Sequence, residues 1–455
     1  MLTTKPITVF FKYAIPSILG LLAISSAGII DGYFVGNYVG PTALAAMNMS
    51  YPIITIIIGF AFMFAVGSSV ICAKLMGEKN LKEANNIFSK SIIFIVFSSI
   101  LLALLLYFNL DNIFSLFNAK EDLKNLTVSY LSIILFFMPI LMVAIVLDFF
   151  VRVDEQPNLA FLALVSSAVA NIILDYIFIV EYGFGIQAAA YATGISQALI
   201  FFILLPYFLS KKSSFSFIKP YGDFSSIYKA MKNGSSEFIN EASAGITVII
   251  FNYIMLQNFG TFGVTAYTII GYFITVSLMI NFAIADSMQP VISKNFGAKN
   301  FIRINKFLKI AVTFLIIIAI VLVSLVLSFP DVLIELFLEG DSKKSIENLT
   351  LQFIYYSWPA FLFSGISILI TSYFTSIQRP FYSITIALSR SFVFPISLII
   401  ILPIYLGSVG IFITLALSEF FTFLIAIYLF LRKREKMPTS LINTNKKDYE
   451  VESLK

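Results

Sequence analysis

The stretch Lys74-Leu-Met-Gly-Glu-Lys-Asn-Leu81 returns, with substitutions, as Lys294-Asn-Phe-Gly-Ala-Lys-Asn-Phe301, 220 residues further along the chain. Each copy lies between two apolar stretches. Two weaker matches keep the same order: Gln156-Pro157 corresponds to Arg379-Pro380, and Gly185-Ile186 corresponds to Gly410-Ile411. Three ordered matches at offsets of 220–225 residues indicate that the chain is built from a duplicated unit.

The composition is that of a membrane protein. The 455 residues are 59% hydrophobic and only 12% charged, whereas soluble domains average about 25% charged residues. A spanning helix needs about 20 mostly apolar residues, and the alternating pattern of a membrane barrel is absent. Twelve segments qualify, near residues 9–36, 43–73, 86–108, 127–150, 158–181, 188–209, 231–256, 264–290, 307–328, 350–376, 382–403 and 409–431.

The basic residues predict how these spans are oriented. Of the 30 Lys and Arg residues, 25 fall in the connections on one side and in the terminal segments, whereas the opposite connections are acidic. Because Lys and Arg accumulate on the cytoplasmic side, both termini are expected in the cytoplasm. The first apolar stretch is too long for a secretory signal, so we expect a retained helix. The predicted location is a bacterial inner membrane, crossed many times.

The duplication predicts the domain organisation of an all-α polytopic membrane protein. Six spans in each half is an even number, so both halves cross the membrane in the same direction. A pseudo-two-fold axis along the membrane normal relates such halves, as in transporters with parallel repeats. We expect an N-terminal lobe (1–210, helices 1–6), a cytoplasmic linker (211–230), a C-terminal lobe (231–432, helices 7–12) and a cytoplasmic tail (433–455).

Several kinds of chemistry are disfavoured. The chain has no histidine, which removes the commonest general base and metal ligand, and it has one cysteine, Cys72. No nucleophile–base pair is evident. We therefore expect neither an enzyme nor a bound cofactor, and no nucleic-acid partner. The basic start of the tail is read as an orientation signal rather than a binding site.

Five stretches carry a resemblance to a known family. They are Gln289-Pro-Val-Ile-Ser-Lys-Asn-Phe-Gly-Ala-Lys-Asn300, Ile30-Asp-Gly-Tyr-Phe-Val-Gly36, Asn171-Ile-Ile-Leu-Asp175, Gly185-Ile-Gln-Ala-Ala-Ala-Tyr-Ala-Thr193 and Gly234-Ser-Ser-Glu237. In this order, and with this number of spans, the chain resembles MATE (multidrug and toxic compound extrusion) transporters over residues 5–435. The resemblance implies a two-lobed bundle with a V-shaped cleft that exports small organic, often cationic, compounds in exchange for protons or sodium. Nothing in the sequence suggests an obligate oligomer, so we expect a monomer.

Charged residues inside the spans are costly and are therefore functional candidates. Counting about 1.5 Å per residue from each point where the chain enters the membrane places Asp31, Asn171, Asp175 and Thr193 in the outer half of the N-terminal lobe. The resemblance implies the same four positions for a cation site. Two such carboxylates repel, so at least one is expected to hold a proton; alternatively, the four oxygen-bearing groups bind sodium. A third interpretation is a buried polar cluster that only tightens the bundle.

The second half lacks carboxylates at the matching positions, which are Phe251 and Leu398. Coupling to a cation is therefore expected in the first lobe. Glu241, Glu237 and Glu419 are weaker candidates for the substrate or for a second cation. Glu237 could instead serve a capping role, and Glu419 could pair with Arg390 in the neighbouring span.

These observations predict a secondary active multidrug exporter that works by alternating access. The first alternative is a flippase for a lipid-linked precursor, which would need basic residues in its cavity for a phosphate headgroup. The second is an uncoupled channel or a membrane receptor, whose transport would not depend on a gradient. Apart from membrane lipid and the substrate, no partner is expected.

Overall fold

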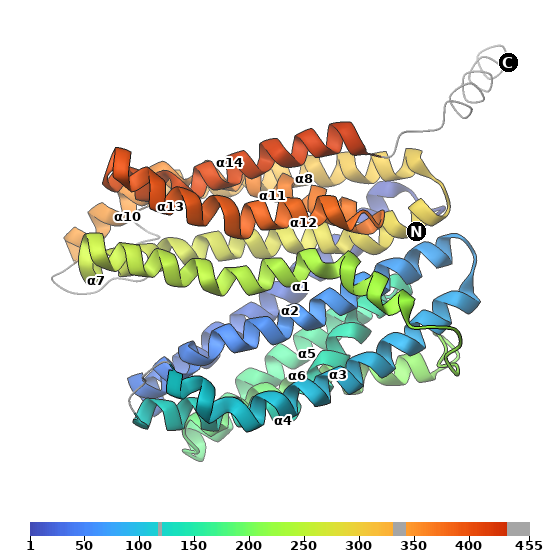
Figure 1. The fold of residues 1–455 in the computed structure, drawn as a ribbon, viewed down its shortest axis with the longest axis horizontal. Coiled ribbons are helices and arrows are strands. Elements are labelled where there is room, and N and C mark those ends of the chain that lie inside the picture. The colour runs from blue at the N-terminus through green and yellow to red at the C-terminus, as the bar shows by residue number, and fades with distance from the viewer. Residues whose placement is uncertain (117–120, 331–342, 435–455) are drawn as a thin grey trace, which may run out of the picture.

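The structure is a computed structural model that describes residues 1–116, 121–330 and 343–434. The predicted tail beyond 434 and the predicted outer-loop residues 331–342 lie outside the described residues. Helices form all the regular structure of the described ranges (Figure 1). They are α1 (Pro6–Phe34), α2 (Pro41–Gly77), α3 (Leu81–Leu116), α4 (Glu121–Val153), α5 (Pro157–Asp175), α6 (Ile186–Leu209), α7 (Ser225–Gly297), α8 (Phe301–Ser328), α10 (Lys343–Ser357), α11 (Ala360–Ser376), α12 (Pro380–Leu388), α13 (Phe394–Leu406) and α14 (Ser408–Lys433), with π-helical segments η1 (Val35–Val39), η2 (Tyr176–Glu181) and η3 (Ser389–Val393).

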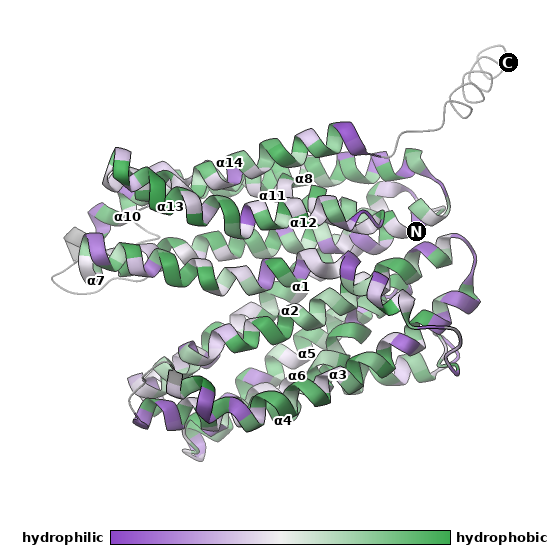
Figure 2. Ribbon diagram, viewed as in Figure 1, coloured by the Kyte–Doolittle hydropathy of each residue, from purple (hydrophilic) through white to green (hydrophobic). Residues whose placement is uncertain are grey.

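The helices account for the twelve predicted spans. Within the described residues, ten helices are long and apolar enough to cross a membrane, and the bent pair of α10 and α11 raises this to eleven. Helix α7 holds two spans, because Gly260 has a left-handed φ of 64° and turns the chain between them. The predicted all-α polytopic membrane fold with 12 transmembrane helices is thus confirmed. Hydrophobic residues cover the helices, and hydrophilic residues concentrate near the ends (Figure 2).

The backbone repeats itself as the sequence predicts. Four residues other than glycine have positive φ in the described ranges: Lys79, Glu155, Lys299 and Gln378. Lys79 and Lys299 follow α2 and α7, at the two copies of the repeated motif. Glu155 and Gln378 each lie two residues before a helix that starts with proline. Equivalent turns in the two halves therefore share the same unusual conformation, which is the structural counterpart of the duplication.

One predicted match is out of register by three residues. The sequence pairs Gly185 with Gly410, because both precede isoleucine. In the structure, however, α6 follows Gly185 and α14 follows Gly407, and both glycines have left-handed φ, of 66° and 56°. The equivalent residue is therefore Gly407. Gly185 and Gly407 are equivalent because both occupy a turn that needs a positive φ, which glycine adopts easily. The isoleucine that follows Gly185 and Gly410 does not mark equivalent positions.

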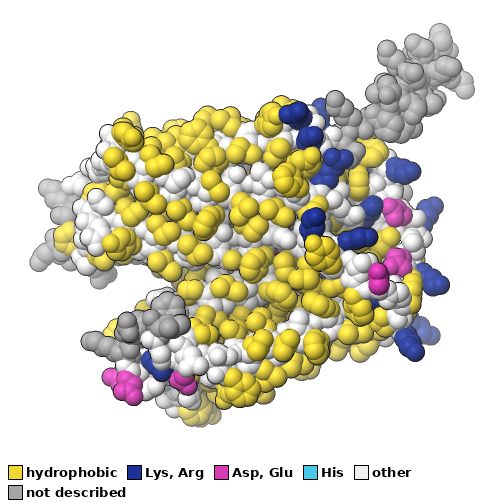
Figure 3. Space-filling model, viewed as in Figure 1, with side chains coloured by type: hydrophobic (Ala, Val, Ile, Leu, Met, Phe, Trp, Pro, Cys, Tyr) yellow, Lys and Arg dark blue, Asp and Glu magenta, His cyan; other side chains and the backbone are white. Residues whose placement is uncertain are grey.

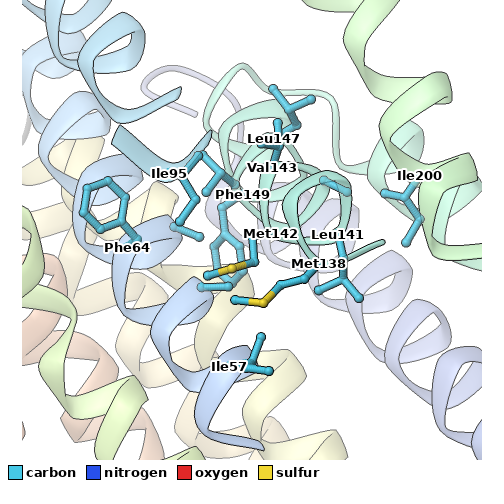
Figure 4. Packing of buried hydrophobic residues seen from close by; sticks show 14 of the residues in the cluster. Ile57, Phe64, Ile95, Met138, Leu141, Met142, Val143, Leu147, Phe149 and Ile200 are labelled. Atoms are coloured by element: carbon cyan, nitrogen blue, oxygen red, sulfur yellow. The ribbon is translucent and has the colours of Figure 1, made fainter. Parts of the chain in front are cut away.

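Two lobes pack around separate hydrophobic cores (Figure 1). The N-terminal lobe consists of α2–α6 together with the second half of α1. In its core, Met138, Leu141 and Met142 of α4 pack between Ile57 of α2 and Ile200 of α6 (Figure 4). Helices α7–α14 form the C-terminal lobe. The first half of α1 belongs to the core of the C-terminal lobe, whereas its second half packs against α5. Helix α1 therefore connects both lobes.

The connection between the lobes is held against the N-terminal lobe. Helix α7 begins at Ser225, inside the predicted linker 211–230. Asp154, just after α4, accepts hydrogen bonds of 2.9 Å from the Ser213 hydroxyl and the Ser214 backbone N–H. The Phe215 side chain is buried, with its ring 5.2 Å from that of Phe88. The linker therefore has a fixed path over this end of the molecule.

The lobes touch along α2 and α7. At Gly67, a methyl group would lie 2.7 Å from the carbonyl carbon of Ala230, and at Gly234 it would lie 2.7 Å from that of Met63. Side chains at these positions would separate the helices, so glycine allows their backbones to meet. Lys and Arg gather at this end of the molecule, which we call the basic end (Figure 3). The two lobes are closed against each other there.

The opposite end is open. The surface is hollowed between the lobes at that end (Figure 3). Gly245 of α7 still lies beside Thr55 of α2. Further from the basic end, Tyr51 of α2 and Tyr253 of α7 are exposed (54% and 61%). The space between α2 and α7 therefore forms a cleft that narrows toward the basic end.

Candidate functional site

Asp31 and Asp175 meet inside the N-terminal lobe. Asp31 lies in the last turn of α1 and is buried, and Asp175 is the last residue of α5 and is 0% exposed. The two carboxyl groups are close enough to interact electrostatically. Neither oxygen of Asp175, nor Oδ1 of Asp31, has a hydrogen-bond partner among the described residues. Because unpaired buried carboxylates are costly, the pair needs a proton or a cation that the described protein groups do not provide.

Irregular helix surrounds these carboxylates. The π-helical segment η1 begins four residues after Asp31, and η2 begins directly after Asp175. The third π-helical segment, η3, contains the buried Arg390. π-Helical turns are rare and often occur at functional sites. All three π-helical segments contain or lie next to a charged residue inside a span, which supports a functional role for Asp31, Asp175 and Arg390.

The other two predicted residues belong to the same region. Asn171 is buried and lies one turn before Asp175, on the same face of α5. Tyr130 of α4 is buried, and it lies close enough to Asp31, Asp175 and Thr193 of α6 to interact electrostatically with them. Sequence reasoning missed Tyr130 of α4. The signal was its hydroxyl, which needs a polar partner when the residue is buried in an apolar span.

The donor set consists of oxygen alone. Two carboxylates, the Asn171 amide and the hydroxyls of Thr193 and Tyr130 lie in this part of the lobe. This set fits a proton held by the carboxylates, and it equally fits a sodium ion, which prefers hard oxygen ligands. The matching region of the C-terminal lobe is apolar: Phe251 is buried and its ring stacks 5.3 Å from that of Tyr267. The two lobes therefore differ in chemistry as predicted.

A second polar cluster joins the two arms of α7. Gln289 donates hydrogen bonds to Asp286 (3.0 Å), to Glu237 (3.4 Å) and to the Ser372 hydroxyl of α11 (3.2 Å). Glu237 also accepts from Asn240 (3.5 Å). Glu237 is thus engaged in a network that ties α7 to itself and to α11. The sequence predicts a solvated or paired structural charge rather than a site residue for Asp286, and Gln289 was not among the predicted site residues.

Glu241 and Glu419 have different surroundings. Glu241 lies against Gly59 of α2, between the lobes where the cleft narrows. Glu419 forms an ion pair of 3.3 Å with Arg390, which also lies 5.0 Å from the ring centre of Phe282. The pairing of Glu419 that the sequence left open is therefore present. Of the three weaker candidates, only Glu241 faces the opposite lobe without a hydrogen bond among the described residues.

A family model decides what kind of protein this is. The MatE model matches residues 16–177 and again residues 239–401, which together exceed half of the chain. The chain belongs to the MatE family. The second match begins 223 residues after the first, at 239 against 16, so the family unit itself occurs twice. The predicted family is thereby confirmed.

Individual relatives agree with this membership. The chain is 23% identical to the multidrug export protein MepA of Staphylococcus haemolyticus over 429 residues, covering 93% of each chain. It is 23% identical to MepA of Staphylococcus saprophyticus over 363 residues, covering 79% of each. A solved multidrug resistance MATE family transporter in an outward-facing conformation superposes with a TM-score of 0.88 at 22% identity, covering 95% of this chain and 96% of that one. The fold is therefore that of a multi-pass MATE transporter.

Proposed function

We propose that this MATE transporter is a secondary active multidrug exporter, which exchanges organic, mainly cationic, compounds for protons or sodium. The observation that carries the proposal is the buried pair Asp31 and Asp175, three of whose carboxylate oxygens have no hydrogen-bond partner in the described part of the chain. A mobile proton or cation would relieve this cost and leave the pair free to release it again. The multidrug export activity named for the MepA relatives supports the choice of substrate.

The distribution of basic residues supports the direction of transport. If the basic end faces the cytoplasm, as the positive-inside rule predicts, the cleft opens outward. The coupling cation then enters the Asp31–Asp175 site from outside. Neutralising these carboxylates lets the end of α1 repack, and because α1 contacts both lobes, the change reaches the cleft. The lobes then rock, the cation leaves on the cytoplasmic side and the next substrate binds.

The cleft offers a negative group to a cationic substrate. Glu241 lies between the lobes, and its neighbour Phe238 also contacts Gly59 of α2. A carboxylate beside aromatic rings suits an organic cation, since rings attract cations over their faces. We assign Glu241 to the substrate, and Glu237 to the network that shapes the same region.

The rival flippase would need free positive charge in the membrane interior. Arg152 donates a 2.6 Å hydrogen bond to Asp148, and Arg390 pairs with Glu419. Both of these buried arginines are therefore neutralised by carboxylates. This favours cationic or neutral cargo over a phosphate headgroup.

The test uses purified protein in liposomes loaded with ethidium. A proton gradient and a sodium gradient are imposed separately on the wild type, on Asp31→Asn and on the control Asp122→Asn, which alters an exposed aspartate at the start of α4. We expect one gradient to drive efflux in the wild type and the control but not in Asp31→Asn. Efflux that is independent of both gradients would indicate a channel, and equal efflux in all three proteins would refute the proposed site.

A further inference from the structure

A cavity of about 530 Å³ lies at the basic end, away from the Asp31–Asp175 site. Its walls come from both lobes and from the linker: the end of α2, the start of α3, residues 221–223, the start of α7 and residues 378–380. Nothing in the proposed transport cycle uses it. A cavity with walls from both lobes depends on how the lobes are arranged, so an occupant would affect that arrangement.

The charge around the cavity is positive. Four lysines line it, namely Lys74, Lys90, Lys229 and Lys232, against two acidic residues, Glu83 and Asp223. Both acids already accept hydrogen bonds: Glu83 from the Tyr221 hydroxyl (2.7 Å) and Asp223 from the Ser225 hydroxyl (2.8 Å). Lys229 and Lys232 are exposed and make no hydrogen bond or ion pair with any described residue, although the charge of Lys229 acts on Asp223 at longer range. These two cations are available to an anion.

The linker closes over a buried lysine on one wall. Lys90 is 2% exposed, and its Nζ donates to the backbone carbonyl of Asp223 and lies 5.5 Å from the ring centre of Phe224. Gly222 has a left-handed φ of 70°. A Cβ at this position would lie 3.9 Å from the Lys90 amine. This wall is therefore built into the fold and does not consist of surface side chains alone.

Two polar atoms on the cavity wall lack partners. Asn233 is 3% exposed; its Nδ2 donates to the Thr375 carbonyl (3.0 Å), but its Oδ1 has no hydrogen-bond partner in the described structure. The buried hydroxyl of Ser226 also lacks one. Buried polar atoms are normally satisfied, so both point to a ligand. The hydroxyl suits an anionic oxygen, and the amide oxygen needs a donor such as a ligand hydroxyl.

The remaining wall is apolar. Ile71 and Leu75 of α2 and Ile87 of α3 line it. They lie near the ends of spanning helices, at the depth where the headgroups of a membrane begin. Basic pockets between helices on the cytoplasmic side bind anionic lipid headgroups. An apolar wall beside lysines suits the glycerol and first acyl carbons of such a lipid.

We propose that this cavity binds a phosphate ester that also carries a hydroxyl group, with the phosphate between Lys229, Lys232 and Ser226 and the hydroxyl on Asn233. Two sources share this chemistry: the headgroup of an anionic phospholipid such as phosphatidylglycerol, and a soluble glycerol phosphate. The apolar wall favours the lipid. Because both lobes contribute to the cavity, the bound lipid stabilises the arrangement in which the basic end is closed.

The test measures binding and does not depend on transport. Thermal unfolding of the purified protein in detergent is followed with added phosphatidylglycerol, phosphatidylcholine or glycerol 3-phosphate. The test variant is Lys229→Gln with Lys232→Gln. The matched control is Lys211→Gln with Lys212→Gln, which removes the same charge from exposed linker positions outside the cavity.

Phosphatidylglycerol should raise the Tm of the wild type and of the control, whereas phosphatidylcholine should not. In the test variant, the phosphatidylglycerol concentration needed for half of the effect should rise roughly thirty-fold. An equal loss in both double variants would overturn the site, because it would reflect net charge alone. A Tm rise with glycerol 3-phosphate at the same concentration would retain the phosphate site and overturn the lipid as its source. No preference for phosphatidylglycerol over phosphatidylcholine in the wild type would overturn the proposal.

Discussion

Replacing Gly67 by alanine should open the basic end. The new methyl group would lie 2.7 Å from the carbonyl carbon of Ala230 and nearer still to its oxygen, although real Cβ contacts essentially never fall below 3.0 Å. The clashing group is the backbone carbonyl of Ala230, which cannot move away by rotating about a side-chain bond. Overpacking of this kind costs about 3 kcal/mol at the upper end of its usual range. If separation of the lobes relieves that cost, the ratio of closed to open molecules falls roughly 150-fold.

Electron paramagnetic resonance distances between two spin labels measure this change directly. Labels at Glu78→Cys and Ala298→Cys, both exposed, report the separation of α2 and α7 at the basic end. Cys72, the one native cysteine, is buried, which keeps it from the label. The control Gly271→Ala has the same chemistry in α7, but its methyl group would meet nothing within 4 Å. Identical distance distributions for the Gly67 and Gly271 variants would refute the reasoning.

Three further predictions concern single contacts. Burial acts to raise the pKa of Glu155, but the hydrogen bond and charge of Lys294 (2.8 Å), with the N-terminal ammonium, hold this pKa below its usual value. Since the folded pKa is lowered, the contact should stabilise the closed basic end at neutral pH and weaken as the pH falls below ~4.3; Glu155→Gln should remove this dependence of the label distance on pH. Arg390→Gln should lower the free energy of unfolding by about 3–5 kcal/mol, because Glu419 is left buried and unpaired. The double variant Arg390→Met with Glu419→Leu should lower it much less, and thermal unfolding of both variants measures the difference. Tyr130→Phe removes a hydroxyl from the proposed cation site and should raise the ion concentration for half-maximal efflux roughly five-fold; an unchanged value would exclude Tyr130 from the site.

The sequence was sufficient for features that depend on length, period and charge. Apolar segments of about 20 residues predict the spans. The repeat is evident when the residues that follow Lys74 are compared with those that follow Lys294. Counting residues from the membrane surface placed Asp31 and Asp175 at similar depth, because helical rise is nearly constant. For the same reason, the i, i+4 spacing placed Asn171 beside Asp175 on one face.

Features that depend on how helices rotate and pack against each other were not predictable in this way. The hydroxyl of Tyr130 indicates a polar partner, but which groups it lies near, Asp31 and Asp175, depends on how α4 packs against α1 and α5. The Gly185–Gly407 equivalence depends on backbone dihedral angles rather than on the next residue. The start of α1 joins the core of the C-terminal lobe although it precedes the N-terminal lobe in sequence. The lysine-lined cavity requires both lobes and the linker together.

The most direct test of the central claim is ion movement driven by the drug itself. Proteoliposomes with equal pH and equal sodium inside and outside receive an ethidium gradient, and the flux of each ion is recorded with an internal dye. In an exchanger coupled at Asp31 and Asp175, ethidium flowing one way must carry protons or sodium the other way, and Asp175→Asn should abolish that return flux while ethidium still binds. Ethidium movement with no return flux in the wild type, or the same flux in Asp175→Asn, would contradict the account.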